Sequence, residues 1–122
     1  MRPITLTVMV FCLLKRVNAE KSVYPRYSLS MNKPQFLEAL SQSGYPEPVE
    51  VQQPPNGHLA DHAHPFAVKA LVIDGYIEIQ TQGTSKRYGV GDIFELEFNQ
   101  THSETYGPLG VKYLASRKLL IN

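Results

Sequence analysis

The fold is decided between residues 57 and 75, which read GHLADHAHPFAVKALVIDG. Residues 66–73 form a dense apolar run in which Lys69 is the one charged residue. An apolar run of this length is typical of a buried strand. Asp74-Gly75 follows it, and this dipeptide is a strong signal for a hairpin turn. We therefore expect a turn at residues 74–75 that leads into a second strand.

Further strands are indicated on the carboxyl-terminal side of this stretch. Apolar and polar residues alternate over residues 77–80 and again over residues 94–98. The second alternation places Glu95 and Glu97 on a solvated face, where they would not form a catalytic pair. A turn is expected at residues 107–110, before the last strand. Short strands separated by turns predict an all-β fold, an antiparallel sandwich or barrel.

One short helix is expected before the strands, over residues 33–43. Asn32 is a favourable N-cap, and Pro34 lies in the first turn, where its missing N–H has no cost. Apolar residues then recur at helical spacing as far as Gly44, which is a common helix stop. The next segment, residues 45–57, contains four prolines and is expected to be extended, with at most a short edge strand.

Charge is distributed unevenly along the 122 residues. The formal net charge of +1 combines +4 in residues 1–30 with −3 in residues 31–122, and so small a total gives no support for nucleic-acid binding. The single cysteine excludes an intrachain disulfide and a multi-cysteine zinc site. The length allows one compact domain, which we place at residues 31–122.

Residues 1–30 are expected to form a leader or arm outside this domain. The apolar run from Ile4 to Leu14 is shorter than the roughly twenty residues that a membrane span needs. It fits the centre of a secretory signal that ends near residue 19, which would make the protein secreted or periplasmic. If the natural start is instead Met31, or the segment is a loose arm, the protein is cytoplasmic, which is the localisation we expect.

All four histidines fall in the predicted β region. Side chains two residues apart on a strand share a face, so His62 and His64 can point into one cavity. His102 lies on a later strand and can join them if the sheet closes into a barrel. Three imidazoles suit a divalent transition metal such as Zn, Fe, Ni, Mn or Cu. The spacing alone also allows an ordinary polar lining, and we expect His58 to be exposed in a loop.

Residues 57–75 resemble the first motif of the cupin superfamily, with Gly57, His62, His64 and Gly75 in register without a gap. The second cupin motif is similar to the segment that starts at Gly91. The resemblance covers about residues 48–117 and is typical of small single-domain, RmlC-like cupins.

The second motif departs from the family pattern at two places. Residues 97–99 stand where Pro-x-Gly is usual, and Tyr106 replaces an asparagine, whereas His102 falls on the motif histidine. What the resemblance implies is a jelly-roll-like barrel, also called a double-stranded β-helix, with a metal near its wider mouth.

The glutamate of the first motif is missing. Val68 occupies its position, and the motif variant with one more residue places Lys69 there. The family resemblance then leaves His62, His64 and His102 as the metal ligands, a set that some cupin oxygenases use. The loss of a carboxylate reduces charge compensation for a bound dication and is expected to weaken its binding.

Other side chains can contribute to the cavity. Glu104 has the same parity as His102, so it can act as a general base or hydrogen-bond a ligand histidine, unless it is a solvated rim residue. Lys69 can bind an acidic substrate or lie in solvent, and Tyr106 and Tyr113 can line the mouth or pack in the core.

Three functions are compatible with these features. The first is a metal-dependent enzyme that acts on a small molecule, and the second is a sensor that binds a sugar or small acid without metal. The third is a barrel whose histidines are structural filling. A small-molecule ligand is expected in the first two, a homodimer is possible, and neither nucleic acid nor a membrane span is expected.

Overall fold

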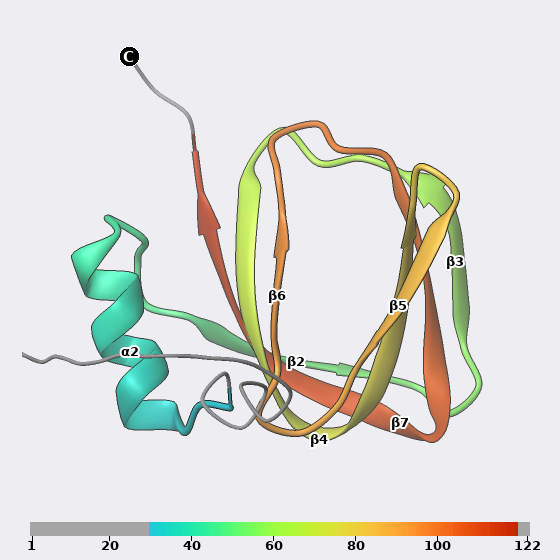
Figure 1. The fold of residues 1–122 in the computed structure, drawn as a ribbon, viewed down its shortest axis with the longest axis horizontal. Coiled ribbons are helices and arrows are strands. Elements are labelled where there is room, and N and C mark those ends of the chain that lie inside the picture. Colours follow the sequence, from blue (N-terminus) through green and yellow to red (C-terminus); the bar gives the residue numbers. More distant parts are fainter. Residues whose placement is uncertain (1–29, 120–122) are drawn as a thin grey trace, which may run out of the picture. The chain divides into compact units, whose positions relative to one another are not determined.

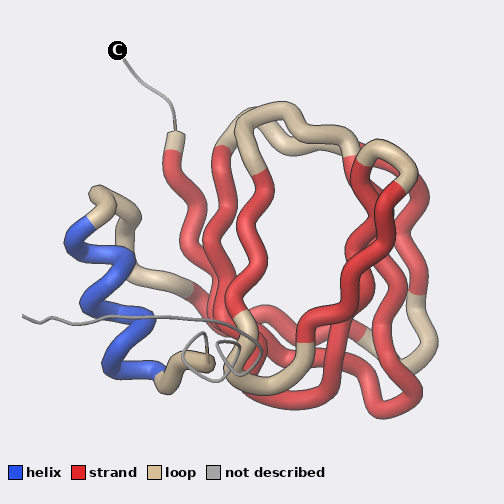
Figure 2. The backbone as a smooth tube through the Cα atoms, in the orientation of Figure 1, coloured by secondary structure: helices blue, strands red, loops and turns tan. Residues whose placement is uncertain are grey.

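The computed structural model describes residues 30–119, so the predicted leader lies outside the described residues except for Ser30. Within this range the chain forms helix α2 (Lys33–Gln42) and six strands, all paired antiparallel. The strands are β2 (Val49–Gln53), β3 (His58–His62), β4 (Ala67–Thr81), β5 (Thr84–Tyr88), β6 (Ile93–Leu96) and β7 (His102–Lys118). They curve into a barrel with α2 outside it (Figure 1; Figure 2). The predicted antiparallel β-barrel with one short N-terminal helix is confirmed.

Strands β4 and β7 organise the barrel because each is long enough to take part in two sheets. The first half of β4 (Ala67–Val72) pairs with the last part of β7 (Tyr113–Lys118), and β2 and β6 extend this sheet on either side. The second half of β4 (Ile77–Gln80) pairs with the first part of β7 (Ser103–Tyr106), and β3 and β5 extend that sheet. The two sheets therefore share both long strands, which join all six strands into one hydrogen-bonded sheet.

The expected hairpin at Asp74-Gly75 is wrong, since β4 continues through this dipeptide. The pairing register with β7 shifts on either side of it, and residues 107–110 of β7 bulge opposite Tyr76. Gly75 has φ +72°, and a Cβ there would collide with the carbonyl oxygen of Gly110. The dipeptide thus makes a bulge that bends the strand, and the β4–β5 turn lies at residues 82–83 instead.

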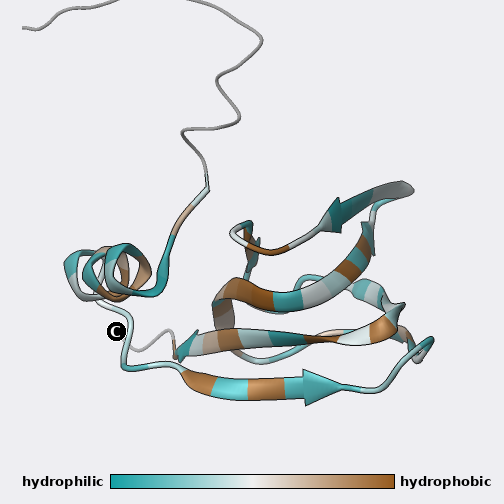
Figure 3. Ribbon diagram, turned by 90° about the horizontal axis from the view of Figure 1, so that it is seen from below, coloured by the Kyte–Doolittle hydropathy of each residue, from teal (hydrophilic) through white to brown (hydrophobic). Residues whose placement is uncertain are grey.

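Hydrophobic and hydrophilic residues alternate along the strands in Figure 3, as expected where successive side chains point to opposite faces of the wall. The inner face of β4 contributes Val68, Ala70 and Val72 to the main core. Leu71 points outward and packs against Phe36 and Leu40 of α2, together with Leu114 and its partly buried neighbours. The helix therefore covers an outer apolar patch and leaves the inside of the barrel free for a site.

Helix α2 begins and ends as its sequence predicts. The Asn32 side chain accepts from the Gln35 backbone N–H at 2.9 Å, and the Gln35 side chain accepts from the Asn32 N–H at 3.0 Å, which completes a capping box. Gly44 follows the helix with φ +77°. In the described part of the chain, no helix has the length and apolar character that crossing a membrane requires.

Candidate metal centre

Three of the four histidines come together inside the barrel. His62, the last residue of β3, pairs in register with His102, the first residue of β7, and their ring centroids are 4.3 Å apart. The His64 ring lies 5.0 Å from that of His62 and 5.1 Å from that of His102. One ligand nitrogen from each ring lies within 4.8 Å of the others. The barrel thus contains three neighbouring histidines that could bind a metal.

Backbone carbonyls fix the orientation of two of these rings. His62 Nδ1 lies 2.7 Å from the carbonyl oxygen of Ala60, and His102 Nδ1 lies 3.0 Å from that of Gln100. A carbonyl oxygen only accepts, so each Nδ1 must carry the proton and donate it. In a neutral ring the lone pair is then on Nε2, the atom that in both rings lies within 3.4 Å of Glu104 Oε2. Metal-ligating histidines in proteins are usually held in this way.

His64 reaches the cluster from the loop after β3 and not from a strand. The backbone N–H of Asn99 donates to the His64 carbonyl at 2.8 Å and ties this loop to the β6–β7 loop. The His64 ring stacks on Phe66 with centroids 5.0 Å apart and planes 7° apart. Burial lowers the pKa of His64, and the neighbouring His102 and His62 lower it further, which favours the neutral, ligating form.

Glu104 lies beside the histidines, buried with 7% of its surface exposed. Its Oε2 atom is 3.0 Å from His102 Nε2 and 3.4 Å from His62 Nε2. The Tyr106 hydroxyl donates to Oε1 at 2.9 Å. Burial is the main cause that raises the pKa of Tyr106, and this hydrogen bond raises it further. The Tyr106 hydroxyl thus holds the carboxylate beside the Nε2 atoms of His62 and His102, where a shared proton or a cation would join it to their lone pairs.

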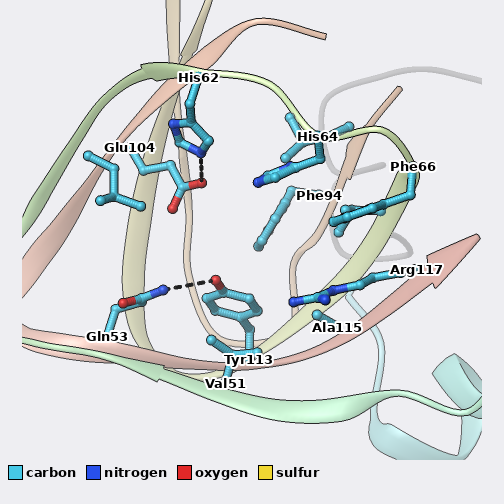
Figure 4. A pocket seen from close by; sticks show the side chains of 13 residues that line it. Val51, Gln53, His62, His64, Phe66, Phe94, Glu104, Tyr113, Ala115 and Arg117 are labelled. Atoms are coloured by element: carbon cyan, nitrogen blue, oxygen red, sulfur yellow. Dashed lines mark hydrogen bonds and ion pairs between the residues drawn. The ribbon is translucent and has the colours of Figure 1, made fainter. Parts of the chain in front are cut away.

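His62 and His64 line a cavity of about 160 Å³ inside the barrel, whereas His102 is fully buried behind its wall (Figure 4). Most of its wall is apolar, with Phe66 and Phe94 prominent. Among its described lining residues, Glu104 is the one with a carboxylate and Arg117 the one with a guanidinium. Val68 also lines this cavity and is 7% exposed, so the position of the missing motif glutamate faces the site.

The other predicted site residues are not all in this cavity. Tyr113 lines it, and Tyr106 packs in the core behind Glu104. Lys69 does not line it, because strand alternation turns it outward, with Nζ 3.8 Å from Glu95 Oε2 and 5.0 Å from the Tyr45 ring centroid. Of the two alternatives for Lys69, the structure thus has the outer-face position, and Lys69 is not a pocket residue.

His58 is exposed as expected, although it starts β3 and does not lie in a loop. Two polar cavity residues, Gln53 and Arg117, were not among the predicted site residues. A sequence signal existed for Arg117, since it continues the alternation of Tyr113 and Ala115 along the inner face of β7. Gln53 offered no comparable signal, because its segment contains so many prolines.

Comparison of the sequence with protein-family models and with curated proteins gives no significant match. Comparison of the structure with solved structures matches several cupins. An RmlC-like cupin from Shewanella frigidimarina NCIMB 400 aligns with a TM-score of 0.53 at 19% identity, over 60% of this chain and 65% of that one. The Cnp3 cupin domain from Schizosaccharomyces pombe aligns with a TM-score of 0.55 at 13% identity, over 62% and 60%.

A conserved protein with a double-stranded β-helix domain, from Klebsiella pneumoniae, aligns with a TM-score of 0.51 at 24% identity, over 58% of this chain and 64% of that one. The matched region thus spans 60–65% of the length of these three structures. At these identities the likeness concerns the fold. The barrel of the described residues therefore has the fold of the small cupin structures.

Proposed function

We propose that the protein binds a divalent first-row transition metal through His62, His64 and His102, and that the metal acts on a small molecule held in the barrel cavity. The observation that carries the proposal is the pair of carbonyl contacts at the Nδ1 atoms of His62 and His102. These contacts leave the lone pairs on the two Nε2 atoms, which both lie within 3.4 Å of Glu104 Oε2. A set of neutral imidazoles suits Zn, Fe, Ni, Mn or Cu.

Glu104 is proposed as the carboxylate that balances part of the metal charge in place of the missing motif glutamate. Two ligand atoms about 2.1 Å from one ion are about 3.0 Å apart at a right angle and about 3.4 Å apart at a tetrahedral angle. The separations of Glu104 Oε2 from the Nε2 atoms of His102 and His62 are 3.0 and 3.4 Å. The carboxylate is therefore at a distance that suits a shared ion.

The metal would supply Lewis-acid polarisation of a substrate oxygen, or redox chemistry if it is iron, manganese or copper. The chain's own residues would position the substrate and exclude water, because the cavity beside the histidines is largely apolar. Glu104 is also placed to take a proton, as its Oε1 atom is held by the Tyr106 hydroxyl.

Metal content and affinity test this function. The full chain, purified without a histidine tag, is treated with EDTA, and Zn²⁺ binding is then measured by calorimetry and plasma spectrometry. We expect about one equivalent of Zn²⁺ in the wild type. Glu104→Gln should weaken Zn²⁺ binding by about 10- to 100-fold, the usual cost of losing a residue that supports a metal ligand. His62→Ala and His102→Ala each remove a ligand and should weaken Zn²⁺ binding by more than this.

His58→Ala is the matched control, since His58 lies on the same strand as His62 but is exposed, with Nδ1 3.0 Å from Thr105 Oγ1. This variant should bind Zn²⁺ like the wild type. Less than about a tenth of an equivalent of any transition metal after reloading, or equal loss in all four variants, would reject the metal site.

A second candidate is a binding protein for a sugar or small acid that works without metal. It is favoured by the 3.0 Å contact between His102 Nε2 and Glu104 Oε2, which one shared proton satisfies without an ion. Thermal-shift measurements on EDTA-treated protein separate the two functions. Stabilisation by a small ligand that Zn²⁺ leaves unchanged supports the metal-free sensor.

A further inference from the structure

The cavity carries one positive side chain, and it lies apart from the outward-facing Lys69. Arg117 projects from the end of β7 toward the cavity in Figure 4, with its Cζ atom 5.0 Å from the centroid of the Phe66 ring. Phe66 in turn stacks on His64. This chain of contacts fixes the guanidinium on the side of the cavity where the ring of His64 lies.

Arg117 has no carboxylate partner among the described residues 30–119, where the ion pairs involve Lys69, Arg87 and the histidines. Glu104, the one described lining carboxylate, is engaged by His102 and Tyr106. The guanidinium donors are therefore available to an anion from solution. A guanidinium is well suited to a carboxylate, because its parallel N–H groups match the two oxygens.

A second donor faces the same space. Gln53 Nε2 donates to the Tyr113 hydroxyl oxygen at 3.5 Å, which leaves the Tyr113 O–H free to donate into the cavity (Figure 4). Burial raises the pKa of Tyr113, so the phenol keeps its proton. Tyr113 and Arg117 lie on the same inner face of β7, with Ala115 between them. Together they give this wall of the cavity the character of an anion subsite.

The cavity volume limits the size of the ligand. An apolar protein cavity of about 150 Å³ holds benzene, with its six carbon atoms. The cavity here, of about 160 Å³, should therefore take a molecule of about six non-hydrogen atoms. Larger acids would have to extend out of the mouth of the barrel.

We propose that the cavity binds a small monocarboxylic acid of about six non-hydrogen atoms, with its carboxylate on Arg117 and Tyr113 and its other end toward His62. The inference rests on the proposed function, because that other end would meet the metal. It names the substrate class of the site, a short oxygenated acid.

Pyruvate and its neutral counterpart pyruvamide test the proposal, since they have equal numbers of non-hydrogen atoms. Dissociation constants are measured by NMR titration of the full chain, both EDTA-treated and Zn²⁺-loaded. We expect pyruvate to bind more tightly than pyruvamide in both forms. Arg117→Gln should weaken pyruvate by about 10-fold and leave pyruvamide unchanged, because a charge-assisted hydrogen bond is lost. Tyr113→Phe should weaken pyruvate by a smaller factor.

Lys69→Gln is the matched control, as it removes one positive charge from the outer face of the same barrel. It should leave pyruvate binding unchanged. Equal binding of pyruvate and pyruvamide, or equal effects of Arg117→Gln and Lys69→Gln, would overturn the subsite. If Zn²⁺ does not bind but the Arg117-dependent preference for pyruvate persists, the metal function fails and the anion subsite stands.

Discussion

At the scale of single residues, the cavity lacks a carboxylate at residue 68, where the cupin motif has one, and holds a carboxylate at Glu104. Val68 lies where the cupin motif has glutamate, and its side chain lines the cavity. Glu104 brings its carboxylate to the same histidines from β7, two residues after His102. Parity along β7 accounts for this placement, because His102 and Glu104 share one face of the strand. The charge that the motif lacks at residue 68 is thus present nearby in space.

Val68→Glu should make stability more dependent on metal. In the metal-free protein, a second buried carboxylate near Glu104 is expected to lower the free energy of unfolding by about 1–3 kcal/mol. Saturating Zn²⁺ should then raise the melting temperature of the variant by more than that of the wild type, since the metal compensates both charges. Val68→Gln is the control, because glutamine has the shape of glutamate without its charge. An equal rise of the melting temperature with Zn²⁺ in both variants would contradict the prediction.

At the scale of elements, the two long strands bend where their glycines lie. Gly75 in β4 and Gly110 in β7 both have positive φ, +72° and +79°, and they approach each other at the bulge. This bend directs one half of each strand into each sheet. It also lets the start of β7 pair with β3, which brings His102 beside His62.

Gly75→Ala should destabilise the barrel strongly. A Cβ at this position combines a disfavoured backbone conformation with a collision against backbone atoms of Gly110, and we expect a loss of about 2–4 kcal/mol in the free energy of unfolding. Urea denaturation followed by circular dichroism measures this. Gly89→Ala is the control, because no atom lies within 4 Å of its Cβ position, and its effect should be below about 0.5 kcal/mol. Similar losses in both variants would argue against a special role for the bulge.

At the scale of the whole domain, two apolar clusters lie on opposite faces of the barrel wall. The inner one includes Val72 and Tyr113 and adjoins the cavity, whereas the outer one joins α2 to Leu71 and Leu114. Adjacent strand residues thus serve different clusters. Stability contributed by the helix should therefore be separable from binding in the cavity.

Phe36→Ala tests this separation, since Phe36 is fully buried in the outer cluster. We expect it to lower the free energy of unfolding by about 3–4 kcal/mol and to leave the Zn²⁺ affinity of the folded protein unchanged. Leu37→Ala, at a neighbouring helix position that is 37% exposed, should cost less than about 1 kcal/mol. A marked fall in Zn²⁺ affinity in Phe36→Ala would show that the helix and the cavity are coupled.

The sequence by itself determined the local features of this protein. The cap at Asn32, the alternation of the strands and the shared face of His102 and Glu104 depend on neighbours a few residues away, so periodicity reveals them. Motif spacing also indicated Gly57, where a Cβ would lie 2.9 Å from Tyr106 Cδ2.

Only the tertiary structure decided how distant segments meet. It turned Asp74-Gly75 into a bulge, because pairing of β4 with β7 extends on both sides of the dipeptide. It also placed Arg117 and not Lys69 in the cavity. An alternating pattern defines two faces of a strand but does not say which one is inside. The register between strands some forty residues apart in the chain, such as His62 with His102, sets that choice through the contacts it buries.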